Sequence, residues 1–95
     1  SAEEQARISE ILATLDAASC SGEWTKTVLD LINEHPGMPA TELATRLGHG
    51  TAQLKRRVRS LKELGLTHSL IQGYCLSPRG RTIVSQASAI WPEPT

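Results

Sequence analysis

The chain has 95 residues, of which 39% are hydrophobic, and it contains two Trp, one Tyr and no Phe. This length favours one small domain with an aliphatic core, and no stretch is apolar over enough residues to span a bilayer. The formal net charge is zero, yet residues 1–45 hold eight of the ten acidic residues and residues 46–95 hold eight of the ten basic ones, an asymmetry expected when only one surface meets phosphate.

The first ten residues do not resemble a secretory signal, so we expect a cytoplasmic protein. Residues 2–18 have the period of an amphipathic helix, and Glu3 and Glu4 suit the positive end of its dipole. Its apolar stripe contains Ala6, Ile8, Ile11, Leu12 and Leu15. This stripe packs either on its own domain or on the same helix of a second chain, and the pattern allows both. Residues 1–22 are therefore interpreted as a packing or dimerisation arm that ends in a short polar linker.

Two further helices are expected, over residues 25–34 and 39–47. Trp24 anchors the start of the first, and residues 35–37 (His-Pro-Gly) end it, because the residue before a proline is disfavoured in a helix. Met38 is then a buried connector, and the second helix opens with a proline at its first position. The inward-facing residues of the second helix are Leu43, Ala44 and Leu47.

The stretch 54–66 is two-faced in both hydrophobicity and charge. Its apolar face contains Leu54, Val58 and Leu61, and its opposite, basic face contains Lys55, Arg56, Arg59 and Lys62. Gly65 followed by Leu66 marks the end of this helix, since glycine allows the left-handed backbone of a helix stop. Residues 48–51 separate it from the preceding helix, which is the spacing of a helix-turn-helix.

A run of basic residues on a helix is more often a solvated face than a binding surface. Here, however, no Asp or Glu lies between Arg46 and Lys62, whereas a solvated helix usually mixes the two signs. The basic face therefore favours DNA binding.

After the basic helix, the pattern changes from helical to extended. Residues 67–71 and 74–76 are rich in strand-forming types, and we expect them to form a hairpin. Gln72 and Gly73 join them as a two-residue turn.

The C-terminal part begins with a marked helix start. Ser77 caps a last helix that has Pro78 at its first position and continues through Val84. Residues 91–95 are proline-rich, and we expect them to form a flexible tail.

Three blocks of sequence carry a family resemblance. They are Glu42-Leu43-Ala44 with Leu47-Gly48, Leu61 with Gly65-Leu66, and the run YCLSPRGR from Tyr74 to Arg81. In this order, over about residues 24–86, they resemble the winged helix-turn-helix domains of regulators such as the MarR, PadR and ArsR families. The resemblance implies a mainly α fold with a small β-hairpin, with residues 23–90 as the winged helix-turn-helix domain between an extra N-terminal helix and a C-terminal helix. It also implies DNA binding and transcription regulation.

Two features depart from these families. Arg57 stands where they usually have an apolar residue, so we expect its head to extend to solvent or the helix to be slightly rotated. The wing is short, and its expected tip, Gln72-Gly73, carries no charge. Longer wings insert a basic residue into the minor groove, and this wing offers none.

On this interpretation the basic helix enters the major groove, where Gln53 can read adenine and Arg56 and Arg59 can read guanine. The expected phosphate contacts are Thr51, Lys55, Lys62, Arg46 on the preceding helix, and Arg79 and Arg81 at the start of the last helix. One module makes too few contacts for tight binding. The expected partners are therefore double-stranded DNA and a second copy joined through the N-terminal or C-terminal helix, or the remainder of a larger protein.

The alternative is a winged helix used for protein contact or dimerisation without DNA binding, which the zero net charge and the neutral wing favour. An enzyme is not expected, and no cofactor or metal is predicted, because no nucleophile motif or phosphate loop is present. The histidines, which lack the spacing of a metal site, are His35, His49 and His68. Cys20 and Cys75 are too few and too far apart for a zinc site and are interpreted as free thiols.

Overall fold

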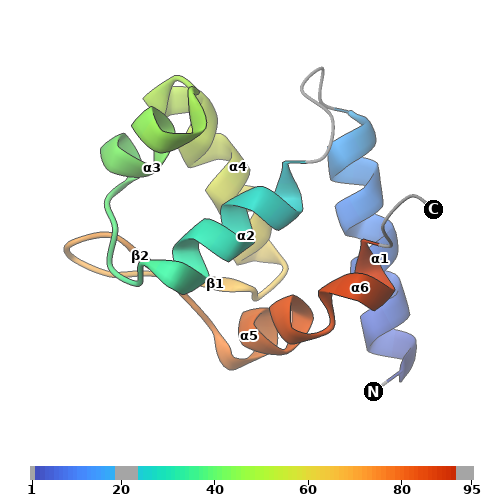
Figure 1. The fold of residues 1–95 in the computed structure, drawn as a ribbon. Helices are drawn as coiled ribbons and strands as arrows, with labels where there is room; N and C mark the ends of the chain where they lie inside the picture. Colours follow the sequence, from blue (N-terminus) through green and yellow to red (C-terminus); the bar gives the residue numbers. More distant parts are fainter. Residues whose placement is uncertain (1, 19–23, 92–95) are drawn as a thin grey trace.

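The computed structural model describes residues 2–18 and 24–91, and in these the fold is mainly α with one small hairpin, as predicted (Figure 1). The helices are α1 (Ala2–Ala17), α2 (Thr25–Glu34), α3 (Ala40–Leu47), α4 (Thr51–Glu63), α5 (Pro78–Ser85) and α6 (Ala87–Ile90). The hairpin strands are β1 (Thr67–Ser69) and β2 (Tyr74–Leu76), which pair antiparallel. Within the described residues, none of the helices is long and apolar enough to cross a membrane.

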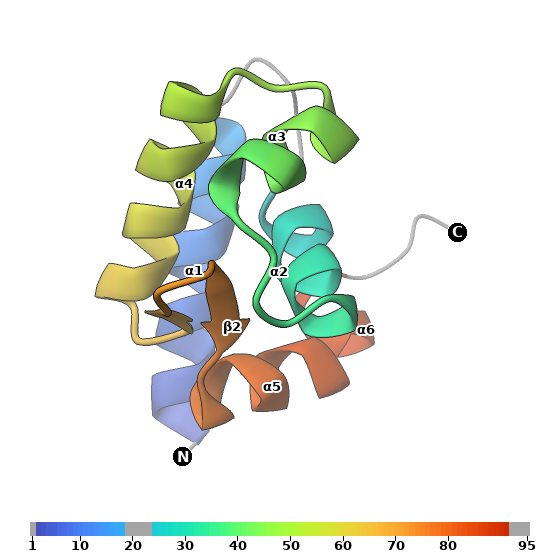
Figure 2. The same ribbon diagram turned by 90° about the vertical axis from the view of Figure 1, so that its left-hand side faces the viewer.

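Helix α2 lies at the centre and contacts α1, α3, α5 and β2 (Figure 1). Helices α3 and α4 pack against each other on one side of it, and α1 runs along the opposite side (Figures 1 and 2). The core between them is aliphatic, as the composition predicts. Its fully buried large side chains include Leu12, Leu29, Ile32, Leu43, Leu54, Leu61 and Leu66.

The N-terminal arm packs on its own domain through part of the expected stripe. Ile8 and Leu12 are buried in the common core, and Leu15 packs at its edge. Ala6 is exposed, and the side chain of Ile11 is 36% exposed. The inward face of α1 is thus rotated from the expected stripe toward Asp16, which is buried.

Asp16 caps a helix other than its own. Its Oδ1 accepts hydrogen bonds from the backbone N–H groups of Trp24 (2.8 Å) and Thr25 (3.0 Å), and its Oδ2 accepts one from the Thr25 hydroxyl (2.8 Å). The first N–H groups of a helix lack partners within the helix, so a carboxylate from α1 satisfies them at the start of α2. This arrangement fixes the angle between the arm and the rest of the domain.

The expectation of a tail from residue 91 is wrong for Trp91 itself. Its side chain is buried, and its Nε1–H donates to the Thr25 hydroxyl oxygen at 3.1 Å. The indole has both a large apolar surface and a donor that needs a partner, and the Asp16–Thr25 junction supplies that partner. Residues 92–95 lie outside the described part of the chain.

The two expected helix stops are present. Gly48 ends α3 with φ of 70°, and Gly65 follows α4 with φ of 77°. At the second stop, the Leu66 N–H bonds the Leu61 carbonyl at 3.1 Å and the Leu66 side chain is fully buried. Both stops need the left-handed backbone that glycine adopts without strain.

The expected two-residue turn of the hairpin is wrong. Ser69 pairs with Tyr74, so residues 70–73 form a four-residue loop, closed by a 2.6 Å bond from Leu70 N–H to the Gly73 carbonyl. The register has a cause outside the hairpin, because Tyr74 also forms a bridge with Met38. The Tyr74 N–H donates to the Met38 carbonyl at 3.2 Å, and the Tyr74 carbonyl accepts from the Gly37 N–H at 2.7 Å. Because β2 is held on both edges at Tyr74, β1 ends at its partner, two residues earlier than expected.

Candidate nucleic-acid interface

Helix α4 presents the two faces that its sequence predicts. Leu54, Val58 and Leu61 are buried in the core. The exposed residues of the opposite side and its flanks are Ala52, Gln53, Lys55, Arg56, Arg59, Lys62 and Glu63. At roughly 100° per residue, the direction opposite the buried side of α4 passes between Arg56 and Arg59. Gln53 lies on one flank of this direction and Lys55 on the other. We call Lys55, Arg56, Arg59 and Lys62 the basic face of α4.

The basic face has no acidic partner among the residues that the structure describes. The described residues form one ion pair between Lys26 and Asp30 on α2 and another between Arg79 on α5 and Glu4 on α1. Neither pair involves the basic face. Glu63 follows directly after Lys62 on α4 and is exposed, without an ion pair to the basic face. Four exposed cations without an ion pair, against the single exposed Glu63, form a helix side suited to polyanions.

Two further predicted contact residues are Arg46 and Thr51. Arg46 is exposed in the last turn of α3 and shares a groove with Asp30 and Glu34 of α2. Thr51 is half-buried at the first position of α4, and Gly50, one of the two expected capping residues, takes the N-cap position without a side chain to make a capping bond. The first N–H groups of α4 have no side-chain cap, and they lie at the positive end of the helix dipole.

Arg57 corrects the expectation drawn from its position. Its head does not reach solvent, since the residue is only 9% exposed. The guanidinium lies over the ring of Trp24, 5.0 Å from the centroid, and its Nη1 bonds Nδ1 of His49 at 2.6 Å. Arginine has no acceptor, so His49 Nδ1 must accept this bond. Arg57 thus holds α4 to the start of α2 and to the turn before α4.

Helical spacing alone could not reveal this role. Arg57 lies at the edge of the apolar stripe, where a long side chain can turn either way. Trp24 and His49 are separated from it by 33 and eight positions in the sequence, and only the packed fold brings the three together. A signal was nevertheless present, because Trp24 is one of only three aromatic residues and borders a helix start.

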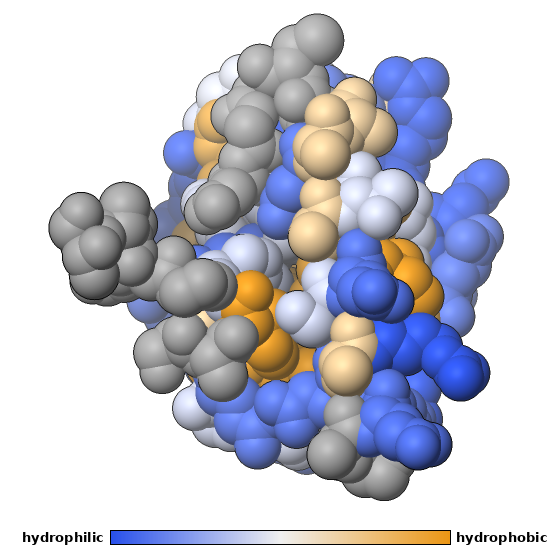
Figure 3. All heavy atoms as spheres, turned by 90° about the vertical axis from the view of Figure 1, so that its right-hand side faces the viewer, coloured by the Kyte–Doolittle hydropathy of each residue, from blue (hydrophilic) through white to orange (hydrophobic). Residues whose placement is uncertain are grey.

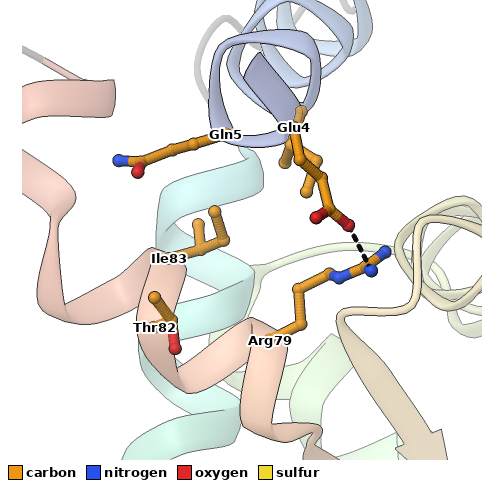
Figure 4. Close-up of a pocket in the computed structure, with 6 residues that line it drawn as sticks. Glu4, Gln5, Arg79, Thr82 and Ile83 are labelled. Carbon is orange, nitrogen blue, oxygen red and sulfur yellow. Dashed lines mark ion pairs between the residues drawn. The ribbon is translucent and has the colours of Figure 1, made fainter. Parts of the chain in front are cut away.

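Arg79 is engaged within the protein rather than turned toward the basic face. Its side chain pairs with the Glu4 carboxylate (Figure 4). Its Nη1 also donates to the Leu64 carbonyl at 3.3 Å. The second bond satisfies a free carbonyl at the end of α4. These bonds join α1, α4 and α5, so Arg79 lies apart from the other predicted contact residues. Arg81, in contrast, is exposed beside His68 and Cys75.

Within the described residues, no group of three or more His, Cys, Asp or Glu side chains is arranged to hold a metal ion. Cys75 carries a free thiol and is half-buried on β2. The predicted free thiol of Cys20 lies outside the described residues.

Comparisons with known proteins agree with this geometry. Residues 25–66 match the family model of winged helix-turn-helix DNA-binding domains. Among solved structures, the chain is similar to the multiple antibiotic-resistance repressor MarR of Listeria monocytogenes 4b F2365, with 27% sequence identity and a TM-score of 0.64. The match covers 87% of this chain and 61% of the repressor chain, so the chain spans less than two thirds of that relative's length. A search of curated protein sequences finds no match.

The fold, the family model and the structural relative together confirm the predicted winged helix-turn-helix domain with its resemblance to MarR-type regulators. The matched family is a DNA-binding one, and neither match is an enzyme.

Proposed function

We propose that this winged helix-turn-helix domain binds double-stranded DNA in a sequence-specific manner through α4, as a transcriptional regulator or as the DNA-binding part of a larger protein. The observation that carries the proposal is the basic face of α4, whose four cations are exposed and unpaired among the described residues. An α-helix fits the major groove of B-form DNA, and the buried leucines opposite the basic face leave the cations directed outward.

The proposed contacts differ in what they recognise. Arg56 and Arg59, nearest the outward direction, donate paired hydrogen bonds to guanine, and Gln53 reads adenine from its flank. Phosphates are bound by Lys55, Lys62, Thr51, Arg46 and Arg81. Arg79 is left out of this set, because Glu4 neutralises its charge and the Leu64 carbonyl takes one of its donors.

We also propose that the domain acts as a dimer through α1, since a single module buries too little surface for tight binding. Ala6, Ala13 and Ala17 are exposed on one side of α1 with spacings of seven and four residues. Figure 3 shows the face of the molecule on which α1 lies in Figure 1, where pale orange, weakly apolar side chains alternate with more hydrophilic ones. Small side chains at this spacing let two helices approach closely. Sedimentation equilibrium should report twice the 10.3 kDa chain mass, and Ala13→Glu should reduce it to one chain.

The test of DNA binding is the salt dependence of duplex affinity. Arg56→Ala with Arg59→Ala should weaken binding, and each lost phosphate or base-edge cation should lower the log–log salt slope by up to about 0.9. Lys26→Ala is the matched control, because Lys26 lies on α2 and pairs with Asp30 at 3.0 Å. Equal affinity and slope for the double variant and the wild type would refute the groove assignment. Failure to shift any duplex at low salt would instead favour the protein-contact alternative.

A further inference from the structure

Leu70 and Ile71 make the tip of the wing apolar. Ile71 is fully exposed, with 107% relative exposure, and Leu70 is 41% exposed. Among the described residues, the other large hydrophobic side chain with comparable exposure is Ile11 on α1, at 36%. The transfer of water-exposed apolar surface into an apolar environment lowers the free energy. The tip therefore favours insertion into an apolar environment.

The fold anchors the base of this tip. The loop is closed by the Leu70 to Gly73 bond, and β2 is fixed to Met38 at the base of the loop. The Gln72 side chain lies against Gly37, with its Cγ 3.6 Å from the position a Cβ would take there. Because the Gln72 side chain lies against Gly37, the exposed apolar side chain at the end of the loop is that of Ile71. A preformed tip binds without the loss of conformational freedom that a mobile loop would suffer.

The hairpin that carries the tip lies beside α4. Strand β1 follows α4 after the Gly65–Leu66 stop and contacts it, and the hairpin and α4 are seen next to each other on one side of the molecule (Figure 2). Residues 67–73 contain no Lys, Arg, Asp or Glu, so the tip does not bind phosphate as a cation would.

We propose that Ile71, backed by Leu70, inserts as an apolar wedge into the minor groove of the duplex that α4 binds. Apolar side chains inserted there partly unstack a base step and kink the duplex. Pyrimidine–purine steps such as TA and CA unstack most easily, so the wing selects such a step next to the site read by α4. The wedge rests on the proposed function, because it needs α4 in the adjoining major groove.

The experiment uses the whole chain and a duplex of about 30 base pairs recovered from a random pool by binding. 2-Aminopurine replaces adenine at successive steps, because its fluorescence rises when its stacking is lost. The wild type should raise the fluorescence at one step beside the α4 site and bend the duplex, as measured by energy transfer between dyes at its ends. Leu70→Ser with Ile71→Ser should abolish both signals and weaken binding about tenfold.

The controls separate the wedge from other roles. Ile11→Ser removes an exposed apolar side chain from α1 and should leave both signals unchanged. Ile71→Lys adds a cation at the tip and should keep affinity while losing the fluorescence signal.

An unbent, fully stacked duplex in the wild-type complex would overturn the wedge, as would serine variants that keep both signals. A change of self-association mass in the serine variants, with the DNA signals intact, would assign the tip to protein contact instead. If Arg56→Ala with Arg59→Ala leaves affinity unchanged, the proposed function itself fails, whatever the wing does.

Discussion

Arg57 places its guanidinium 5.0 Å from the ring centroid of Trp24, on the inner side of the helix whose outer side is basic. The same guanidinium bonds His49 in the turn between α3 and α4 at 2.6 Å. One side chain therefore holds the orientation of α4 relative to α2 and to the turn. Arg57 therefore adds to the packing of the buried leucines, which together fix the direction of the basic face.

Replacing Arg57 should destabilise the domain. Arg57→Ala removes a desolvated cation–π contact and a charged hydrogen bond, so we expect the free energy of unfolding to fall by about 2–4 kcal/mol in urea titrations. Arg57→Met keeps most of the buried stem and should cost less. A change below about 0.5 kcal/mol for the alanine variant would mean that the stack contributes nothing to stability.

Asp16 should be the most sensitive acidic position of the described residues. Asp16→Ala leaves two backbone N–H groups and the Thr25 hydroxyl without their acceptor at the start of α2, and we expect a loss of about 2–4 kcal/mol. Asp16→Asn keeps one acceptor oxygen and should lose less. Asp30→Ala is the control, since its pair with Lys26 is half-exposed and should contribute at most about 1 kcal/mol. Equal losses at Asp16 and Asp30 would contradict the capping role.

Gly80 and Gly50 should respond in opposite ways to the same substitution. A Cβ at Gly80 would collide with the backbone carbonyl of Leu66, and we expect Gly80→Ser to cost about 1–3 kcal/mol by thermal unfolding. A Cβ at Gly50 meets nothing within 4 Å, and serine there can cap α4. Gly50→Ser should therefore leave the melting temperature unchanged or raise it. A melting temperature for Gly80→Ser equal to that of the wild type would show that α5 can move away from the Leu66 carbonyl without loss of stability.

Local signals predicted most of this fold because each of them acts within a few residues. The leucine period of α4, the Gly65–Leu66 stop and the Ser77 cap all appear as expected, the last with the Gly80 N–H donating to the Ser77 hydroxyl at 3.0 Å. Their geometry depends on backbone dihedrals and nearest turns, which the chain determines without its tertiary neighbours.

The errors share a different cause, which is contact between distant segments. The burial of Arg57 depends on Trp24, and the burial of Trp91 depends on the Asp16–Thr25 junction. The loop of the wing depends on Met38, more than 30 residues before it. No period or spacing within one element encodes such pairings, so the sequence could name the outer cations of the site but not what holds their helix.

The division of the basic face into base-reading and phosphate-binding residues predicts two kinds of loss. Lys62→Ala should weaken binding to every duplex by a similar factor and lower the salt slope by about 0.9, because phosphates are the same in all sequences. Arg59→Ala should cost about 1–3 kcal/mol on the preferred duplex and much less on one with the guanine replaced, because a paired contact to that base is lost. Fluorescence anisotropy over a salt series with both duplexes measures the two effects together. If Arg59→Ala weakens both duplexes equally, Arg59 binds phosphate, and base reading falls to Arg56 and Gln53.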